Sequence, residues 1–320
     1  MFYMDFRTTV TPTPHPGLIA HNRPMLMLGS CFTDNIGARL NDALFDVCIN
    51  PFGTLYNPAS VASAFRDVKA CRAFGVEDLF EHQGRYHSFS HHSMYSGVDS
   101  TQVLDRINRS VAEAHDLLNR DAVVIVTFGT AYVFEKDGRV VSNCHKLPAA
   151  TFNRRRMSVD EIVAIWSDIL SHHKSMFVFT VSPIRHLADG AHDNQLSKST
   201  LLLAVEQLCE RFEHALYFPS YEIMMDDLRD YRFYASDMTH PSDVAVDYIY
   251  SGFARAMMTS DTCMLAQQCE KLARRLAHRF MTDDVQAIER FEQATNEMAR
   301  QLLLSNPCLK RALEKRNIKL

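Results

Sequence analysis

Ser30 is the first residue whose type and position could perform catalysis. It lies between an apolar run at 25–29 and an amphipathic pattern at 33–45, which together predict a strand, a tight turn and a helix. Open α/β sheets bind ligands at the carboxyl ends of their strands, and the free N–H groups of a helix N-terminus stabilise negative charge. Ser30 is therefore a candidate nucleophile. The alternative is that Ser30 or Thr33 only caps the helix.

Asp237 and His240 are candidates for the rest of a catalytic set. They stand three residues apart, just before a helix predicted at 243–258. A histidine so placed could take the proton of a nucleophilic hydroxyl while the aspartate fixes its tautomer. Cys31 is an alternative nucleophile, because a helix N-terminus favours a thiolate. Most free cysteines, however, are small apolar core residues.

The elements that must position these residues alternate between strand and helix. Strands are predicted at 25–29, 47–49, 122–128, 176–181 and 216–218. Helices are predicted at 33–45, 58–69, 98–119, 158–173, 197–213 and 243–258. This alternation indicates a parallel, doubly wound α/β sheet. The strand at 122–128 is apolar on both faces and belongs in the middle of that sheet.

Two segments do not follow the alternation. The pattern around Asp137 and Gly138 predicts a β-hairpin over 132–141, inserted at the carboxyl edge of the sheet. The segment 76–97 resists assignment and carries the histidine group His87, His91 and His92. A spacing of four residues would suit two zinc ligands on a helix, but glycine and serines disfavour a helix here and no third ligand is evident. Pocket-lining or surface histidines are expected, with no metal and no cofactor.

The chain beyond residue 258 is predicted to be almost wholly helical, with helices at 260–279 and 283–304. We therefore expect an α/β domain over 1–258 and a helical extension over 259–320. Its composition suggests packing on the main domain or on a second chain, which would make a homo-oligomer. The tail is expected to be a solvated basic face, formed by Lys310, Arg311, Lys315, Arg316 and Lys319.

Composition excludes several classes of protein. The chain has 320 residues, of which 47% are hydrophobic, so it can bury a sizeable core. A formal charge of −4 gives no electrostatic footprint for nucleic acid or an anionic membrane. Eight cysteines without a C-x-x-C pair favour reduced thiols. No signal-peptide pattern and no apolar run of about 18 residues is present, so a cytoplasmic protein without a membrane span is expected.

Several separated motifs resemble the GSCFA domain family over about residues 30–255. They are Gly29-Ser30-Cys31-Phe32, Asn50-Pro51-Phe52-Gly53-Thr54, Gly129-Thr130-Ala131-Tyr132, Asn143-Cys144-His145-Lys146 and Ser182-Pro183-Ile184-Arg185-His186. That family is similar in turn to the SGNH (GDSL-type) hydrolases, which are esterases and acyl hydrolases. The resemblance implies a flavodoxin-like three-layer α/β/α sandwich with a central parallel sheet.

The resemblance also implies roles for individual residues. Ser30 matches the nucleophile of the first SGNH block, and Asp237 and His240 match the D-x-x-H of the last. The N–H groups of Ser30 and Gly53 would form the oxyanion hole. The third block normally supplies an asparagine, where this chain has Gly129-Thr130-Ala131. The hydroxyl of Thr130, or Asn143 from the hairpin, would then be the remaining donor.

These expectations describe a serine hydrolase that cleaves an ester-linked acyl group, such as an O-acetyl group on a carbohydrate or small metabolite. A second hydroxyl in place of water would make it an acyltransferase. Arg185 and His186 could bind a substrate carboxylate or phosphate, or form a buried salt bridge. His145 and His87 are further substrate-binding candidates. The alternative function is a ligand-binding protein on the same scaffold, favoured by the missing asparagine because one lost oxyanion donor costs about 100- to 1000-fold in turnover.

Overall fold

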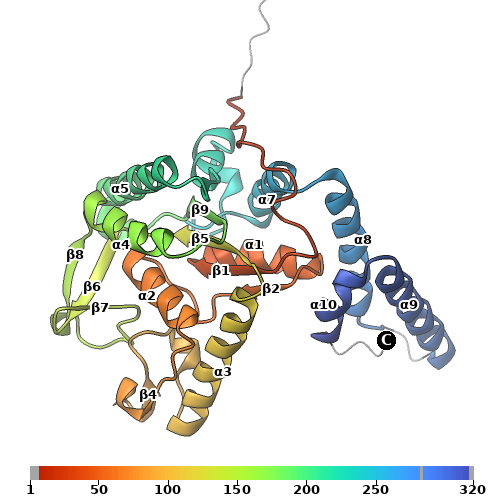
Figure 1. Cartoon of the computed structure of the whole chain (residues 1–320), viewed down its shortest axis with the longest axis horizontal. Helices are drawn as coiled ribbons and strands as arrows, with labels where there is room; N and C mark the ends of the chain where they lie inside the picture. Colours follow the sequence, from red (N-terminus) through yellow and green to blue (C-terminus); the bar gives the residue numbers. More distant parts are fainter. Residues whose placement is uncertain (1–6, 282–283, 317–320) are drawn as a thin grey trace, which may run out of the picture.

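A five-stranded parallel sheet organises the chain. The computed structural model describes residues 7–281 and 284–316 (Figure 1). The strands lie in the order β2 (Val47–Ile49), β1 (Met25–Gly29), β5 (Val123–Phe128), β9 (Phe177–Val181) and β10 (Ala215–Tyr217). Counted along the chain within this sheet, the order is 2-1-3-4-5, the flavodoxin-like arrangement. The predicted fold is confirmed, and β5 is fully buried.

Helices cover both faces of the sheet and complete three layers. Side chains of β1 alternate between two cores, with Leu26 and Leu28 in one and Met25 and Met27 in the other. The first core is closed by α2 (Pro58–Lys69), α3 (Ser100–Leu118), α4 (Val159–Ser171) and α5 (Gly190–Arg211). The second is closed by α1 (Cys31–Asp42) and α7 (Asp243–Met257). The alternation follows from the pleat of a strand, in which successive side chains point to opposite faces.

Two predicted helices begin earlier than expected. The first begins at Cys31 rather than at residue 33, because Ser30 has extended backbone angles and its side chain accepts from the N–H of Phe32. The helix predicted at 197–213 begins at Gly190. The earlier start of α1 places Cys31, and not Ser30, on the first turn of the helix.

Short antiparallel sheets occupy the two irregular segments. The unassigned segment 76–97 contains a hairpin of β3 (Phe80–His82) and β4 (Arg85–His87). The hairpin predicted at 132–141 is confirmed as β6 (Tyr132–Lys136) and β7 (Arg139–Val141). It gains a third strand, β8 (Asn153–Arg156), that the sequence did not indicate. Between β10 and α7, a short helix α6 (Ser220–Glu222) continues into a π-helical turn over Ile223–Asp227.

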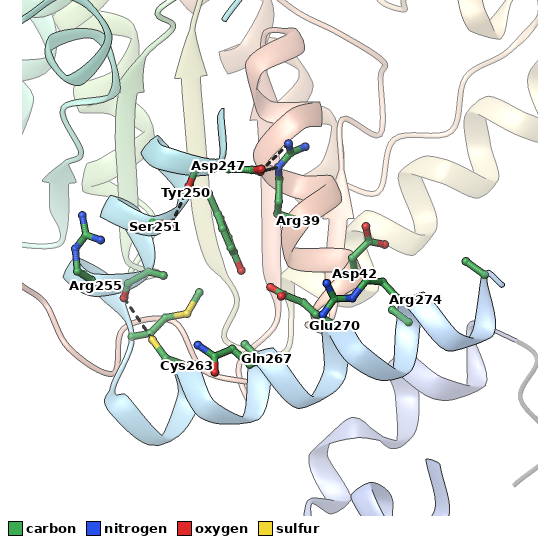
Figure 2. A pocket seen from close by; sticks show the side chains of 15 residues that line it. Arg39, Asp42, Asp247, Tyr250, Ser251, Arg255, Cys263, Gln267, Glu270 and Arg274 are labelled. Carbon is green, nitrogen blue, oxygen red and sulfur yellow. Dashed lines mark hydrogen bonds and ion pairs between the residues drawn. The ribbon is translucent and has the colours of Figure 1, made fainter. Parts of the chain in front are cut away.

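The C-terminal helices extend from one end of the sandwich (Figure 1). They are α8 (Ser260–Leu276), α9 (Val285–Ser305) and α10 (Lys310–Glu314); residue 283, where α9 was predicted to begin, lies outside the described residues. Their apolar cluster includes Leu44, which follows α1. A cavity of about 620 Å³ separates α8 from α1 and α7. On the side opposite α8, Arg39 of α1 forms an ion pair with Asp247 of α7 at 2.8 Å, and Figure 2 shows the two side chains directed at each other.

The basic tail is not simply a solvated face. Asp46 is largely buried and accepts an ion pair from Lys315 at 2.7 Å and from Arg120 at 2.7 Å. Arg316 donates to the carbonyl oxygen of Asn41. These contacts tie α10 to the α1–β2 connection, whereas Lys319 lies outside the described residues. The ion pairs lower the pKa of Asp46, against the opposing effect of its burial.

None of the helices in the described part of the chain combines the length and the apolar character needed to cross a bilayer.

Candidate active site

Cys31 and His240 face each other at the carboxyl end of the sheet. Cys31 is the first residue of α1, and its Sγ lies 3.7 Å from Nε2 of His240. Nδ1 of His240 lies 2.5 Å from Oδ2 of Asp237. Because a carboxylate only accepts, the proton lies on Nδ1, which leaves Nε2 free to accept the thiol proton. The three side chains are arranged as nucleophile, general base and orienting acid.

The Asp237 turn is held by its own side chain. Oδ1 of Asp237 accepts from the backbone N–H groups of Thr239 and His240, each at 2.9 Å. These backbone hydrogen bonds, followed by the bond to the His240 ring, hold the pKa of Asp237 far below its usual value. The carboxylate therefore stays ionised across the range in which histidine titrates, and the imidazole keeps one orientation.

Ser30 is placed differently from Cys31. Its side chain is 1% exposed, and its Oγ accepts from the N–H of Phe32 at 3.3 Å. It therefore acts as the helix cap, as the alternative interpretation expected. Burial, and then the charge of Asp34, raise the pKa of the Cys31 thiol. A protonated thiol at neutral pH requires a base, and His240 is in the position of that base.

A cavity of about 800 Å³ opens in front of Cys31 and His240. The expected site residues Thr130, Asn143, Arg185 and His186 also line it. Its wall comes from the β1–α1 turn, the β6–β7 insertion and the loop before α5, which are far apart in sequence. Loops that follow β1, β5 and β9 therefore meet at the carboxyl edge of the sheet.

The expected oxyanion donors need revision, because most of them already have acceptors. The N–H of Ser30 donates to the carbonyl of Thr127 at 3.2 Å, and the N–H of Gly53 donates to that of Asn50 at 2.7 Å. The hydroxyl of Thr130 is engaged with Ser197 at 3.1 Å. Neither backbone group is free to receive an oxyanion in this conformation.

Two other donors at the cavity have no acceptor among the described residues. They are the backbone N–H of Cys31 and Nδ2 of Asn57. Asn57 caps α2, its Oδ1 accepts from the N–H of Ser60 at 2.8 Å, and its side chain lines the cavity. That bond fixes the amide so that Nδ2 faces away from the helix, which makes Asn57 a candidate that motif comparison did not single out.

An amide–carboxylate network joins the first two loops. The N–H of Gly29 donates to Oδ1 of Asn50 at 2.8 Å, and Nδ2 of Asn50 donates to Asp34 at 2.7 Å. Asp34 is one turn along α1 from Cys31, and burial raises its pKa. The network fixes the distance between the β1–α1 turn and the loop before α2, and therefore the position of Cys31.

A polar face at the start of α5 supports the other loops. Ser197 Oγ accepts from the N–H of Ala131 at 2.8 Å, and Asn194 Oδ1 accepts from that of His186 at 2.8 Å. Lys198 is fully buried, and its Nζ donates to the carbonyls of Gly129 and Ser182, each at 2.7 Å. The signal for this face is present in the sequence, because the polar positions 194 and 198 continue into the apolar positions 201, 205 and 208.

The other histidines of the site prediction lie away from the cavity. His145 Nε2 contacts the carbonyl of Ser88 at 2.8 Å, and His87 Nδ1 contacts Oγ of Ser96 at 2.7 Å. Both are buried, and neither is among the residues that line the cavity in the described chain. In this structure their ring nitrogens contact groups of the irregular segment, Ser88 and Ser96. No group of three or more side chains able to hold a metal ion occurs within residues 7–281 and 284–316.

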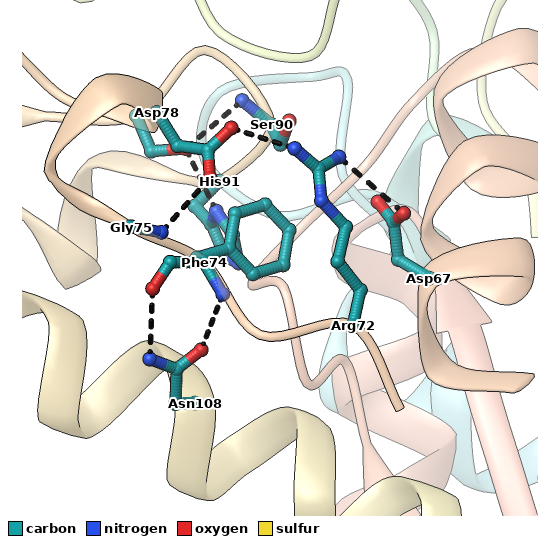
Figure 3. Close-up of polar contacts among 9 residues, drawn as sticks. Asp67, Arg72, Phe74, Gly75, Asp78, Ser90, His91 and Asn108 are labelled. Atoms are coloured by element: carbon teal, nitrogen blue, oxygen red, sulfur yellow. Dashed lines mark hydrogen bonds and ion pairs between the residues drawn. The ribbon is translucent and has the colours of Figure 1, made fainter. Parts of the chain in front are cut away.

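His91 packs beneath the Gly53 turn. Its ring stacks on Phe52, with centroids 4.4 Å apart, and meets the edge of Phe74 (Figure 3). Phe74 is held by Asn108, while Arg72 bridges Asp67 and Asp78. His91 is 0% exposed, and burial lowers its pKa to about 3. It is neutral in the folded protein.

We expect His91 to make the protein less stable in acid. As the pH falls, His91 takes up a proton in the unfolded chain before it does so in the folded protein. The unfolding free energy is therefore unaffected by His91 above about pH 6.5 and decreases as the pH falls from there towards about 3. At pH 5 the loss is about 2 kcal/mol of unfolding free energy. Urea unfolding at pH 7 and pH 5 measures it. His91→Phe should flatten this dependence, whereas His172→Phe, at an exposed position, should not.

Comparison with protein families gives one finding. The model of the GSCFA family matches residues 24–253, which include the sheet, the cavity and both Cys31 and His240. No curated protein and no solved structure gave a significant match. A match over most of the chain, with the site residues inside it, establishes the family. The chain belongs to the GSCFA family.

Proposed function

We propose that this protein is an acyl hydrolase or acyltransferase that acts on an ester-linked acyl group, with Cys31 as the nucleophile. The observation that carries the proposal is the 3.7 Å approach of Cys31 Sγ to His240 Nε2, with Asp237 on the opposite ring nitrogen. Kinship with the SGNH hydrolases is part of the proposal, supported by the strand order and by the order of the motifs.

The proposed reaction begins with attack of Cys31 Sγ on the acyl carbonyl carbon, as the thiol proton moves to His240 Nε2. The N–H of Cys31 and the amide of Asn57 receive the oxyanion. When the tetrahedral intermediate collapses, the bond to the alcohol oxygen breaks and the alcohol takes the proton from His240. The acyl group stays on Cys31 as a thioester. Water, with His240 as base, then releases the carboxylic acid and restores the thiol. A second alcohol in place of water would give acyl transfer.

The cavity volume of about 800 Å³ supports a small substrate, such as an acylated sugar unit or metabolite. A ligand-binding protein is the second candidate. The N–H groups of Ser30 and Gly53 already donate to backbone carbonyls, which leaves fewer donors for an oxyanion and so favours a binding protein. Turnover of p-nitrophenyl acetate and of acetylated sugars, followed by product release, distinguishes the two.

Asp237→Asn is expected to lower kcat about 100- to 10,000-fold, because the amide can donate to Nδ1 and so favour the wrong tautomer of His240. Steady-state hydrolysis of p-nitrophenyl acetate measures the effect. Asp230→Asn is the matched control, since Asp230 is exposed and lies seven residues earlier on the same connection. Equal activity of wild type and Asp237→Asn would remove Asp237 from the mechanism.

A further inference from the structure

The charges around the Cys31 cavity are unequally paired. Arg154 donates to Asp189 at 2.6 Å and lies over the ring of Tyr132 at 4.1 Å. Asp189 is the one carboxylate among the described residues that line the cavity, and Asp237, which lies outside that lining, is engaged by His240. A further positive charge at this cavity therefore finds no free carboxylate among the described residues that line it.

Arg185 supplies such a charge. It lines the cavity, and its backbone N–H donates to the carbonyl of Thr239 at 3.2 Å, which fixes it beside the His240 turn. No carboxylate lies within ion-pair distance of its guanidinium in the described ranges, so the alternative of a buried salt bridge is not realised. Its Nε is buried and has no acceptor among the described residues, while the guanidinium forms a side-chain hydrogen bond with the hydroxyl of Tyr234.

Lys198 adds a second cation behind the first. Its Nζ donates to two backbone carbonyls but meets no carboxylate within residues 7–281 and 284–316. Burial lowers its pKa to about 7, and Cys31 is the acidic group that opposes this effect. A buried cation without an anion is unfavourable, so negative charge arriving at the cavity would stabilise it.

Buried nitrogens without a hydrogen-bond partner occur in the loop that forms this wall and at the start of the helix that follows it. Asn194 Nδ2 and His186 Nε2, like Nε of Arg185, have no hydrogen-bond partner in the described structure. All three are nitrogens of one short segment, from the loop before α5 to its second turn. Buried donors are normally paired, so the unpaired Nε of Arg185 and Nδ2 of Asn194, which can only donate, support an acceptor that arrives with a ligand.

We propose that the Cys31 cavity takes an anionic substrate, whose carboxylate or phosphate binds Arg185 beside the acyl group that Cys31 attacks. A guanidinium presents a planar pair of donors that matches either anion. The inference rests on the proposed function, because it requires Cys31 to be the attacking group. It adds the charge of the substrate, which the catalytic arrangement alone does not specify.

The test compares iodoacetate with iodoacetamide, which alkylate thiols by the same substitution and differ in charge. Peptide mass spectrometry gives the rate at Cys31 for each reagent. A thiolate without nearby cations repels iodoacetate and reacts faster with the amide. We expect wild type to react at least as fast with iodoacetate. Arg185→Gln should lower the iodoacetate-to-iodoacetamide ratio about tenfold.

Two control variants show whether the change in the alkylation ratio comes from the charge of Arg185. Arg185→Lys keeps the charge and should retain most of the ratio, which distinguishes charge from a folding defect. Arg66→Gln removes an arginine paired with Asp168, far from the cavity, and should leave the ratio unchanged. A wild-type ratio well below one that Arg185→Gln does not alter would overturn the anionic substrate. Failure of both reagents at Cys31 would instead overturn the proposed nucleophile.

Protection experiments identify the anion. Succinate and inorganic phosphate are each added during alkylation of wild type by iodoacetamide. Slower alkylation with succinate supports a carboxylate, and slower alkylation with phosphate supports a phosphate. Protection should be lost in Arg185→Gln. Protection by neither ion, or equal protection in wild type and Arg185→Gln, counts against the proposal.

Discussion

Cys31→Ala is expected to lower turnover of acyl esters by at least about 1000-fold, because it removes the atom that forms the acyl-enzyme. The alanine also suits the first position of α1, so the fold should be unaffected. Hydrolysis of p-nitrophenyl acetate measures the loss, and circular dichroism verifies the fold.

Ser30→Ala is the matched control at the neighbouring position. Ser30 caps α1, so its loss should cost about 1 kcal/mol of unfolding free energy while most activity remains. Urea unfolding and the same ester assay give both quantities. Inactive Ser30→Ala together with active Cys31→Ala would return the nucleophilic role to the serine.

Gly29→Ala is expected to destabilise the protein by more than about 3 kcal/mol. Gly29 has φ +145°, and a Cβ added there would lie 2.2 Å from the carbonyl oxygen of Thr127. That carbonyl accepts the N–H of Ser30, so the turn carrying Cys31 would be displaced as well. Thermal and urea unfolding measure the loss, and the rate of Cys31 alkylation reports the displacement.

Gly84→Ala separates backbone strain from the steric clash. Gly84 also has a positive φ, +70°, but nothing lies within 4 Å of an added Cβ. The cost there should be about 1 kcal/mol, the ordinary penalty for a left-handed alanine. If Gly29→Ala were no more harmful than Gly84→Ala, the close approach of β1 and β5 at this turn would not constrain the fold.

The sequence allowed the sheet and its carboxyl edge to be predicted because the signals there are local. The run at 122–128 is apolar on both faces, and it is the central strand. The helix predicted at 58–69 is α2, and Asn57 caps it with Pro58 in its first turn, a typical helix start. The strands β3, β4 and β8 are short and rich in polar residues, so their pairing depends on tertiary contacts that no local pattern reveals.

The choice between Ser30 and Cys31 depended on where α1 begins. A helix starting at residue 33 would leave both side chains in the turn, where either could face a ligand. The helix in fact starts at Cys31, so Ser30 becomes the cap and Cys31 projects from the first turn towards His240. A difference of two residues at a helix end is within the normal uncertainty of such boundaries, yet here it changes the proposed nucleophile from a serine oxygen to a cysteine sulfur.

The roles of Lys198 and Asn57 could not be predicted, because each depends on its bonding partners. Lys198 reaches carbonyls at the ends of β5 and β9, which are 69 and 16 residues away in sequence. Asn57 caps α2 through its Oδ1, and only the position of the cavity wall shows that its Nδ2 is available to a ligand.

The central claim is that a thioester forms on Cys31. Wild-type protein is mixed with p-nitrophenyl acetate, quenched in acid during turnover, digested and mapped by mass spectrometry. The account predicts an acetyl group on Cys31 that neutral hydroxylamine removes. An acetyl group on Ser30, or no covalent adduct on any peptide while ester is being hydrolysed, would contradict it.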